Sequence, residues 1–136
     1  MIQPIMKDVF FLQQKSEPAT EADRQVIVDL LDTLRANAAG CVGMAANMIG
    51  VHKNIIVFHN GLFPELMFNP EIIAKSGKYE TEEGCLSLVG VRPCTRYENI
   101  TVRYQDRAFN WHTRNFTGYT AEIIQHEIDH CNGIII

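Results

Sequence analysis

The sequence predicts a single α+β domain over residues 1–136, with antiparallel strands between an N-terminal and a C-terminal helix. Apolar residues recur at helical spacing near the start and again at the end of the chain. The middle consists of short runs rich in β-branched and aromatic residues. The order helix, strands, helix favours α+β over an alternating α/β fold, and 136 residues suffice for one domain.

The first helix is expected within residues 18–40. Its apolar face consists of Ile27, Leu30, Leu31 and Leu34. Thr20 with Asp23 three positions later is typical of a capped start, and Gly40 is expected just past the end. We expect this helix to cover the core.

Short strands are predicted across the middle of the chain, with Asp106-Arg107 as a tight connection between the last two. They are residues 54–60, 65–73, 77–88, 99–106 and 109–116. The second helix is predicted from Gly118 to Cys131, with Thr117 as its cap and Gly133 just past its end. A short final strand is expected over 134–136.

Composition and charge exclude several classes of protein. A hydrophobic share of 46% and a charged share of 21% predict a packed core and not a disordered chain. A net charge of -4 without a dense Lys/Arg run argues against nucleic acid or an anionic membrane as a direct partner. No apolar run has the length of a signal peptide or a membrane span, so we expect a cytoplasmic protein with four reduced cysteines.

The segment HEIDH, residues 126–130, is the strongest chemical signal. Residues four apart share a face of a helix, so His126 and His130 can bind one metal ion. Glu127 lies beside them as a candidate base, which gives two ligands and a base on one rigid element. The alternative is a surface helix end with histidines near its negative dipole terminus.

A third ligand is expected upstream, because only six residues follow His130. The upstream histidines His52, His59 and His112 lie in or beside strand-like runs, where other roles are commoner. Cys131 points about 100° away from His130 around the helix. Cys85 follows Gly84 in a run that could lie against the last helix, and a thiolate with two imidazoles would leave one metal position open. A buried free cysteine remains the alternative.

Three motifs in this order resemble the peptide deformylase family. They are GMAANMIG at residues 43–50, EGCLS at 83–87 and QHEIDH at 125–130. The segments FNPEII, GVR and RYENITVRYQD are also similar, so the resemblance spans nearly the whole chain.

The resemblance implies a metal-dependent hydrolase that removes the N-formyl group from the N-terminal methionine of new polypeptides. Cys85, His126 and His130 would be the metal ligands, with Glu127 as general acid and base and the Leu86 backbone N–H as an oxyanion donor. The metal in such enzymes is typically Fe²⁺, with Zn²⁺, Ni²⁺ or Co²⁺ able to replace it. The implied fold is a set of antiparallel strands packed around the C-terminal HExxH helix.

Two positions of the first motif depart from the family. Met48 replaces a glutamine whose amide donates to the oxyanion, and a thioether cannot donate a hydrogen bond. Cys41 replaces the motif's first glycine and is expected to reshape the groove beside the metal. Asn47 is the alternative donor if the local register shifts.

Further residues are expected to bind substrate or to support the site. The expected substrate-binding residues are Gly43, Met44, Gly84, Arg92, Tyr119, Glu122 and Ile123. Glu122 is a polar residue where a methionine side chain must fit. Asp129 is expected either to pair with Arg96 and fix the helix against the strands, or to remain solvated.

The leading hypothesis is a peptide deformylase of the translation machinery, acting on formyl-methionyl nascent peptides with transient ribosome contact. The chain would be a monomer or a weak homodimer. One alternative is a related amidohydrolase with another small N-acyl substrate. Another is a non-catalytic metal-binding paralogue, against which the presence of Glu127 argues.

Overall fold

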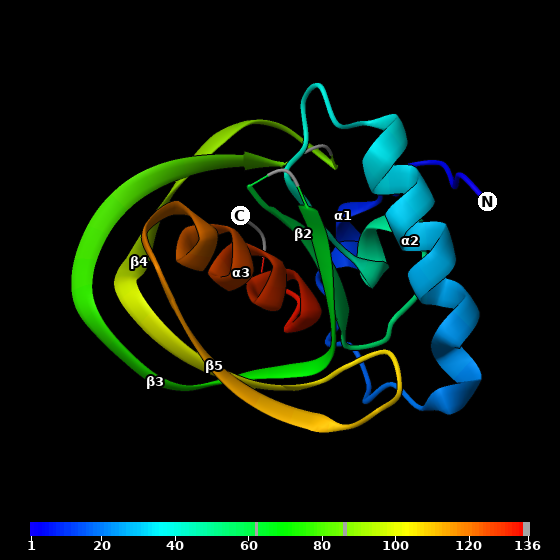
Figure 1. Cartoon of the computed structure of the whole chain (residues 1–136). Coiled ribbons are helices and arrows are strands. Elements are labelled where there is room, and N and C mark those ends of the chain that lie inside the picture. Colours follow the sequence, from blue (N-terminus) through cyan, green and yellow to red (C-terminus); the bar gives the residue numbers. More distant parts are fainter. Residues whose placement is uncertain (62, 86, 135–136) are drawn as a thin grey trace.

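The computed structural model describes residues 1–61, 63–85 and 87–134, and it confirms the predicted α+β class. Two longer helices and a five-stranded antiparallel sheet form the domain (Figure 1). In chain order the elements are α1 (Val9–Leu12), η1 (Glu21–Asp23), α2 (Arg24–Ala36), β1 (Gly43–Ala45), η2 (Ala46–Ile49), β2 (Ile55–Asn60), β3 (Phe63–Cys85), β4 (Leu88–Gln105), β5 (Trp111–Thr117) and α3 (Gly118–Cys131).

The sheet is a meander in the order β1-β2-β3-β4-β5, and its long strands curve around α3 (Figure 1). The register between β3 and β4 shifts at Phe68/Glu71, Ile72/Ala74 and Gly84/Cys85. Such bulges bend a strand and increase its twist. The curvature brings the end of β3, which contains Cys85, back toward the C-terminal helix.

Several predicted boundaries were wrong. The predicted strand 65–73 and residues 77–85 of the next form one strand, β3, which passes through the polar stretch before Gly77 without a turn, whereas Leu88 begins β4. Gly77 has a φ of 77°, and a Cβ there would lie 2.8 Å from the Cβ of Glu98. The first helix starts as a 3-10 turn and ends at Ala36, so Gly40 is not its terminating residue. The connection between β4 and β5 spans Asp106 to Asn110 and is longer than expected.

The core has two parts, on opposite faces of the β1–β2 end of the sheet. In β2, Ile56 and Phe58 pack with residues of α3, while Ile55 and Val57 pack with residues of α2. Alternate residues of a strand face opposite sides, so a strand buried on both faces is apolar throughout. The predicted role of the first helix as a core cover is confirmed by its buried Ile27, Leu30 and Leu34.

The predicted bounds of α3 are confirmed, and its C-terminal end is firmly fixed. The Gly133 N–H donates to the His130 carbonyl over 3.0 Å, and the Ile134 N–H donates to the Asp129 carbonyl over 2.9 Å. With Gly133 at a φ of 74°, this is a Schellman motif. The Ser16 N–H also donates to the Cys131 carbonyl over 2.8 Å. The expected strand over 134–136 falls largely outside the described residues.

Gly133→Ala should lower the free energy of unfolding by about 2 kcal/mol or more, because two costs add. The left-handed backbone disfavours any side chain, and a Cβ would lie 2.3 Å from the Gln13 carbonyl oxygen. Urea unfolding measures the loss. Gly61→Ala is the matched control, with a φ of 67° but open space around its Cβ, and should lose only about 1 kcal/mol. Equal losses in the two variants would refute the steric part of this account.

Candidate active site

The helix α3 and the end of β3 bring the three predicted metal ligands together. The ligand atoms of Cys85, His126 and His130 all lie within 4.8 Å of one another. Both histidines are buried, and Cys85 is partly buried. The upstream histidines have other neighbours: His52 stacks on Phe11, and His112 lies 2.6 Å from a carboxylate oxygen of Asp106. Cys85 is therefore the upstream candidate ligand that lies beside the two histidines.

The acid–base properties of this group fit a bound divalent cation. Burial raises the pKa of the Cys85 thiol, but hydrogen bonds to His126 and His130 outweigh burial and lower it to about 6. Burial lowers the pKa of His126, but hydrogen bonds to Cys85 and Glu83 raise it to about 10. A partly buried thiolate beside two histidines whose pKa values are raised is a donor set that a metal ion can occupy in place of protons.

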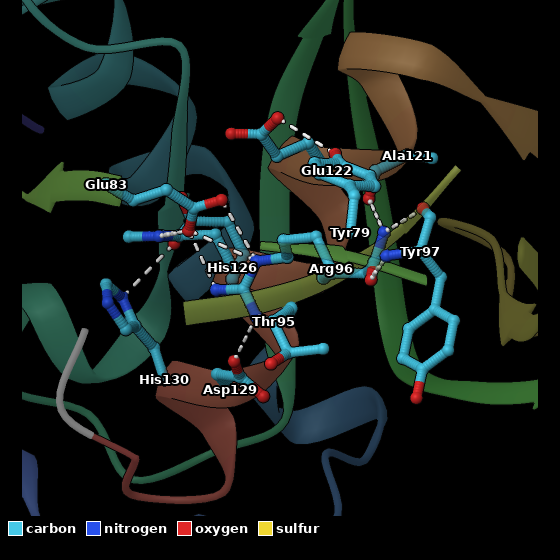
Figure 2. A network of polar contacts seen from close by, with 12 residues as sticks. Tyr79, Glu83, Thr95, Arg96, Tyr97, Ala121, Glu122, His126, Asp129 and His130 are labelled. Atoms are coloured by element: carbon cyan, nitrogen blue, oxygen red, sulfur yellow. Dashed lines mark hydrogen bonds and ion pairs between the residues drawn. The ribbon is translucent and has the colours of Figure 1, made fainter. Parts of the chain in front are cut away.

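His126 is oriented by a carboxylate on the neighbouring strand. Its Nδ1 lies 2.7 Å from Oε1 of Glu83, and both side chains are buried. An Nδ1–H that donates to this carboxylate leaves the Nε2 lone pair available for a metal. Glu83 in turn accepts two hydrogen bonds from Arg96 of β4, over 2.7 Å from Nη2 and 3.0 Å from Nε (Figure 2).

The predicted ion pair between Arg96 and Asp129 is confirmed. Nη1 of Arg96 donates to Oδ2 of Asp129 over 2.7 Å, so one guanidinium joins β3, β4 and α3 (Figure 2). Arg96 is only 4% exposed, and removing one partner of a buried pair typically costs about 3–5 kcal/mol. The network therefore fixes the rotation of α3, which contains His126 and His130, against the sheet.

A second side chain on α3 adds to this attachment. Gln125 accepts a hydrogen bond from the Tyr97 N–H over 2.9 Å and donates to the Tyr97 carbonyl over 2.8 Å. The Gln125 amide thus pairs with both backbone groups of Tyr97, as a residue of a neighbouring strand would. The segment from Gln125 to Asp129 is thus held to β4 at both ends, with His126 and Glu127 between.

Gly43 lies against the candidate base. A Cβ on Gly43 would lie 2.9 Å from Oε2 of Glu127 and 2.8 Å from Cγ2 of Ile123. Only a residue without a side chain leaves room for the carboxylate at this distance from β1. Oε1 of Glu127 is buried and lies 3.3 Å from Nδ1 of His130, and neither atom has another hydrogen-bond partner among the described residues.

A cavity of about 590 Å³ opens beside the metal group, a size typical of small-molecule sites. Its lining residues are Gly40, Cys41, Val42, Gly43, Met48, Glu82, Glu83, Gly84, Cys85, Gly90, Tyr119, Glu122, Ile123, His126 and Glu127.

Most of the predicted substrate-binding residues line this cavity, and two do not. Met44 is fully buried in the core between the sheet and α2. Arg92 lies on β4 opposite Glu83, and its buried Nη1 has no hydrogen-bond partner in the part of the chain that the structure describes. Neither reaches the cavity wall. The proposed oxyanion donor, Leu86, lies outside the described residues.

Met48 lines the cavity where the family glutamine is expected, and it is 1% exposed. The alternative donor is not available: Asn47 directs its amide away, with Nδ2 donating to the His130 carbonyl over 2.9 Å. Asn47 thus holds the end of α3. Cys41 also lines the cavity, and its thiol donates to the Gly43 carbonyl over 3.0 Å. Cys41, which the sequence predicts to alter the groove relative to the family's glycine, is therefore part of the cavity wall.

Glu122 is bound to its surroundings on the cavity side of α3. The Tyr79 hydroxyl donates to Oε1 of Glu122 over 3.0 Å. Burial and the neighbouring Glu83 raise the pKa of Glu122. No local pattern in the sequence indicates a role for Tyr79, Glu82 or Gln125. For Glu83 a signal was present, because a residue two before Cys85 lies on the same face of a strand.

Comparison with known proteins agrees with this geometry. The family model described as Polypeptide deformylase matches residues 2–136. This chain belongs to the peptide deformylase family. It is 60% identical over 136 residues to a peptide deformylase of Clostridium beijerinckii, with 100% of both chains covered.

Solved structures of the family have the same fold. A peptide deformylase from Legionella pneumophila is 34% identical with a TM-score of 0.87, over 99% of this chain and 83% of that one. A class I type b peptide deformylase from Acinetobacter baumannii, bound to Met-Ala-Ser, is 26% identical with a TM-score of 0.89, over 99% and 97%.

The family membership establishes the activity class. The protein is a hydrolase that removes formyl groups from nascent polypeptides, and its family consists of metalloenzymes. The Cys85, His126 and His130 group is a possible metal site of this kind. Among the described residues, no helix has the length and apolar character needed to cross a membrane.

Proposed function

We propose that Cys85, His126 and His130 hold a ferrous ion and that Glu127 is the general acid and base for hydrolysis of formyl-methionyl peptides. The observation that supports this most strongly is the 4.8 Å grouping of the three ligand atoms, with the buried carboxylate of Glu127 beside His130. A thiolate and two imidazoles also suit Zn²⁺, Ni²⁺ or Co²⁺. A divalent ion at this position supplies Lewis acidity, which lowers the pKa of a water molecule and polarises a carbonyl group.

The side chains of the protein supply binding and proton transfer. The buried carboxylate of Glu127 accepts a proton from the attacking water and returns it to the leaving amine. The backbone of Gly43 lies close beside it, since a Cβ there would be 2.9 Å from Oε2 of Glu127. The substrate lies in the cavity beside Gly84, Tyr119, Glu122 and Ile123. The Leu86 backbone N–H is the proposed donor to the developing oxyanion.

We further propose that the enzyme acts in the cytoplasm and that residues 1–136 form a single domain. It would be a monomer or weak homodimer that contacts the ribosome transiently. Its substrates are new polypeptides that retain formyl-methionine at the N-terminus.

Release of formate from formyl-Met-Ala-Ser by anaerobically prepared, iron-loaded protein tests the proposal. We expect turnover and about one metal ion per chain in the unaltered protein. Cys85→Ala should weaken metal binding by more than about 100-fold and abolish turnover, because the site loses a direct ligand. Cys94→Ala is the matched control, since Cys94 lies on β4 outside the metal group, and it should retain both properties.

Two results would contradict the proposal. Retained metal and turnover in Cys85→Ala would exclude Cys85 as a ligand. Stoichiometric metal without formate release would favour the second candidate, an amidohydrolase with another small N-acyl substrate, for which the loss of the glutamine at Met48 is the specific observation.

A further inference from the structure

A hydrogen bond joins α3 to β3 at the wall of the active-site cavity. The Tyr79 hydroxyl of β3 donates to Oε1 of Glu122 of α3 over 3.0 Å, and both side chains are half-buried (Figure 2). Glu122 lines the cavity, whereas Tyr79 is not among the described residues of its wall. The carboxyl group of Glu122 also lies beside Glu83, another residue of β3. The polar end of Glu122 is therefore held against β3, and its methylene groups extend from the helix toward that strand.

The place of this bond relative to the reaction follows from helix geometry. Glu122 and Ile123 precede His126 by four and three residues, so they lie on its face of α3, about 5.4 Å or less toward the N-terminus. The formyl carbon must react beside His126 and Glu127. Only one nitrogen atom separates it from the first Cα of the substrate, a distance of about 2.4 Å. The side chain of the first residue can therefore lie against Glu122 and Ile123.

A carboxyl group that faces a methionine side chain would lose hydration without gaining a hydrogen-bond partner. The bond to Tyr79 avoids this cost, because the carboxyl group has its partner at β3 and only methylene groups of Glu122 face the first side chain. We propose that Tyr79 is a positioning residue for substrate specificity, which holds Glu122 so that the cavity accepts the apolar side chain of methionine. Tyr79 acts through Glu122 and does not touch the substrate. This role rests on the proposed function.

Two substrates that differ only in the first side chain test this role. The ratio of kcat/KM for formyl-Met-Ala-Ser to that for formyl-Ala-Ala-Ser measures what the methionine side chain contributes. In Tyr79→Phe the carboxyl group of Glu122 loses its donor and is repelled by Glu83, so it should turn into the cavity. We expect the ratio to fall by about tenfold or more, because methionine would then displace water from this carboxyl group. The loss should appear mainly in KM, since the changed contact is with a side chain that does not react.

Two further variants separate positioning from a general loss of structure. Tyr104→Phe is the matched control, because it also removes a hydrogen-bonded hydroxyl, from β4 and outside the described residues of the cavity wall. It should change the ratio by less than about twofold. Glu122→Leu in the Tyr79→Phe background removes the carboxyl group and should restore the ratio to within about threefold of the unaltered enzyme. If the folded, metal-loaded double variant does not recover the ratio, Tyr79 does not act through Glu122.

The outcomes distinguish this role from the proposed function. An unchanged ratio in Tyr79→Phe would overturn the role of Tyr79, while turnover of formyl-Met-Ala-Ser would leave the function intact. If the unaltered enzyme hydrolyses neither peptide, the proposed function fails. Calorimetric binding of the products Met-Ala-Ser and Ala-Ala-Ser to the unaltered protein and to Tyr79→Phe then decides the role. Equal affinity ratios in the two proteins would overturn it, and a lower ratio in Tyr79→Phe would support it.

Discussion

Glu127→Gln should lower kcat for formyl-Met-Ala-Ser by about 100- to 10,000-fold while about one metal ion per chain is retained. The amide has nearly the shape of the carboxylate, so it fits the space beside Gly43. It cannot accept a proton from water at neutral pH. Formate release and metal content, measured on the same preparation, separate loss of the base from loss of the ion.

The structure favours glutamine over alanine for this test. A shorter side chain would leave a gap beside Gly43, and water or the neighbouring His130 could move into it. Glu80→Gln is a control on an exposed acid of β3 outside the cavity, and its kcat should stay within about twofold of the unaltered enzyme. If Glu127→Gln retained kcat within tenfold, another group would have to transfer the proton.

Local signals in the sequence predicted the helix that contains the site. Thr117 and Gly133 mark the two ends of α3, and the observed bounds agree with them. The four-residue spacing placed His126 and His130 on one face, since it follows from helix geometry alone. The spacing of Asp129 from His126 suggested a pair with Arg96, but it did not exclude a solvated carboxylate; the contact with β4 decides between them.

Features that depend on distant contacts were not predictable in the same way. The polar stretch that interrupts β3 has the composition of a connection, and only its pairing with β4 makes it part of a strand. The contact of Gly43 with Glu127 joins residues far apart in the chain, so no local pattern indicates it. The direction of Met44, into the core and not into the cavity, depends on how η2 follows β1.

The role of Asn47 shows why a neighbouring residue cannot simply replace a missing one. Its amide is close in sequence to the expected donor, but it is already bound to the His130 carbonyl over 2.9 Å. To turn toward the cavity it would have to give up this bond at the end of the metal-binding helix. Removing a hydrogen-bond partner from the buried His130 carbonyl costs free energy, so the observed orientation of the Asn47 amide is favoured.

Met48→Gln should therefore raise kcat by about 100-fold, the usual value of one oxyanion donor. Glutamine has the length and unbranched shape of methionine, so it can follow the same path along the cavity wall. Its amide would enter an apolar cluster with Cys41 and Ile55, which should cost about 1–3 kcal/mol of unfolding free energy. Steady-state kinetics and urea unfolding of one preparation measure the gain in rate and the loss in stability together.

Met48→Leu separates the hydrogen bond from side-chain shape, because leucine is apolar and offers no donor. We expect its kcat to remain within about threefold of the unaltered enzyme, so a gain seen only with glutamine would belong to the amide. An unchanged kcat in folded, metal-loaded Met48→Gln would have a different meaning. Oxyanion stabilisation would then already be complete without this side chain, and the backbone donor proposed at Leu86 would suffice with the metal ion.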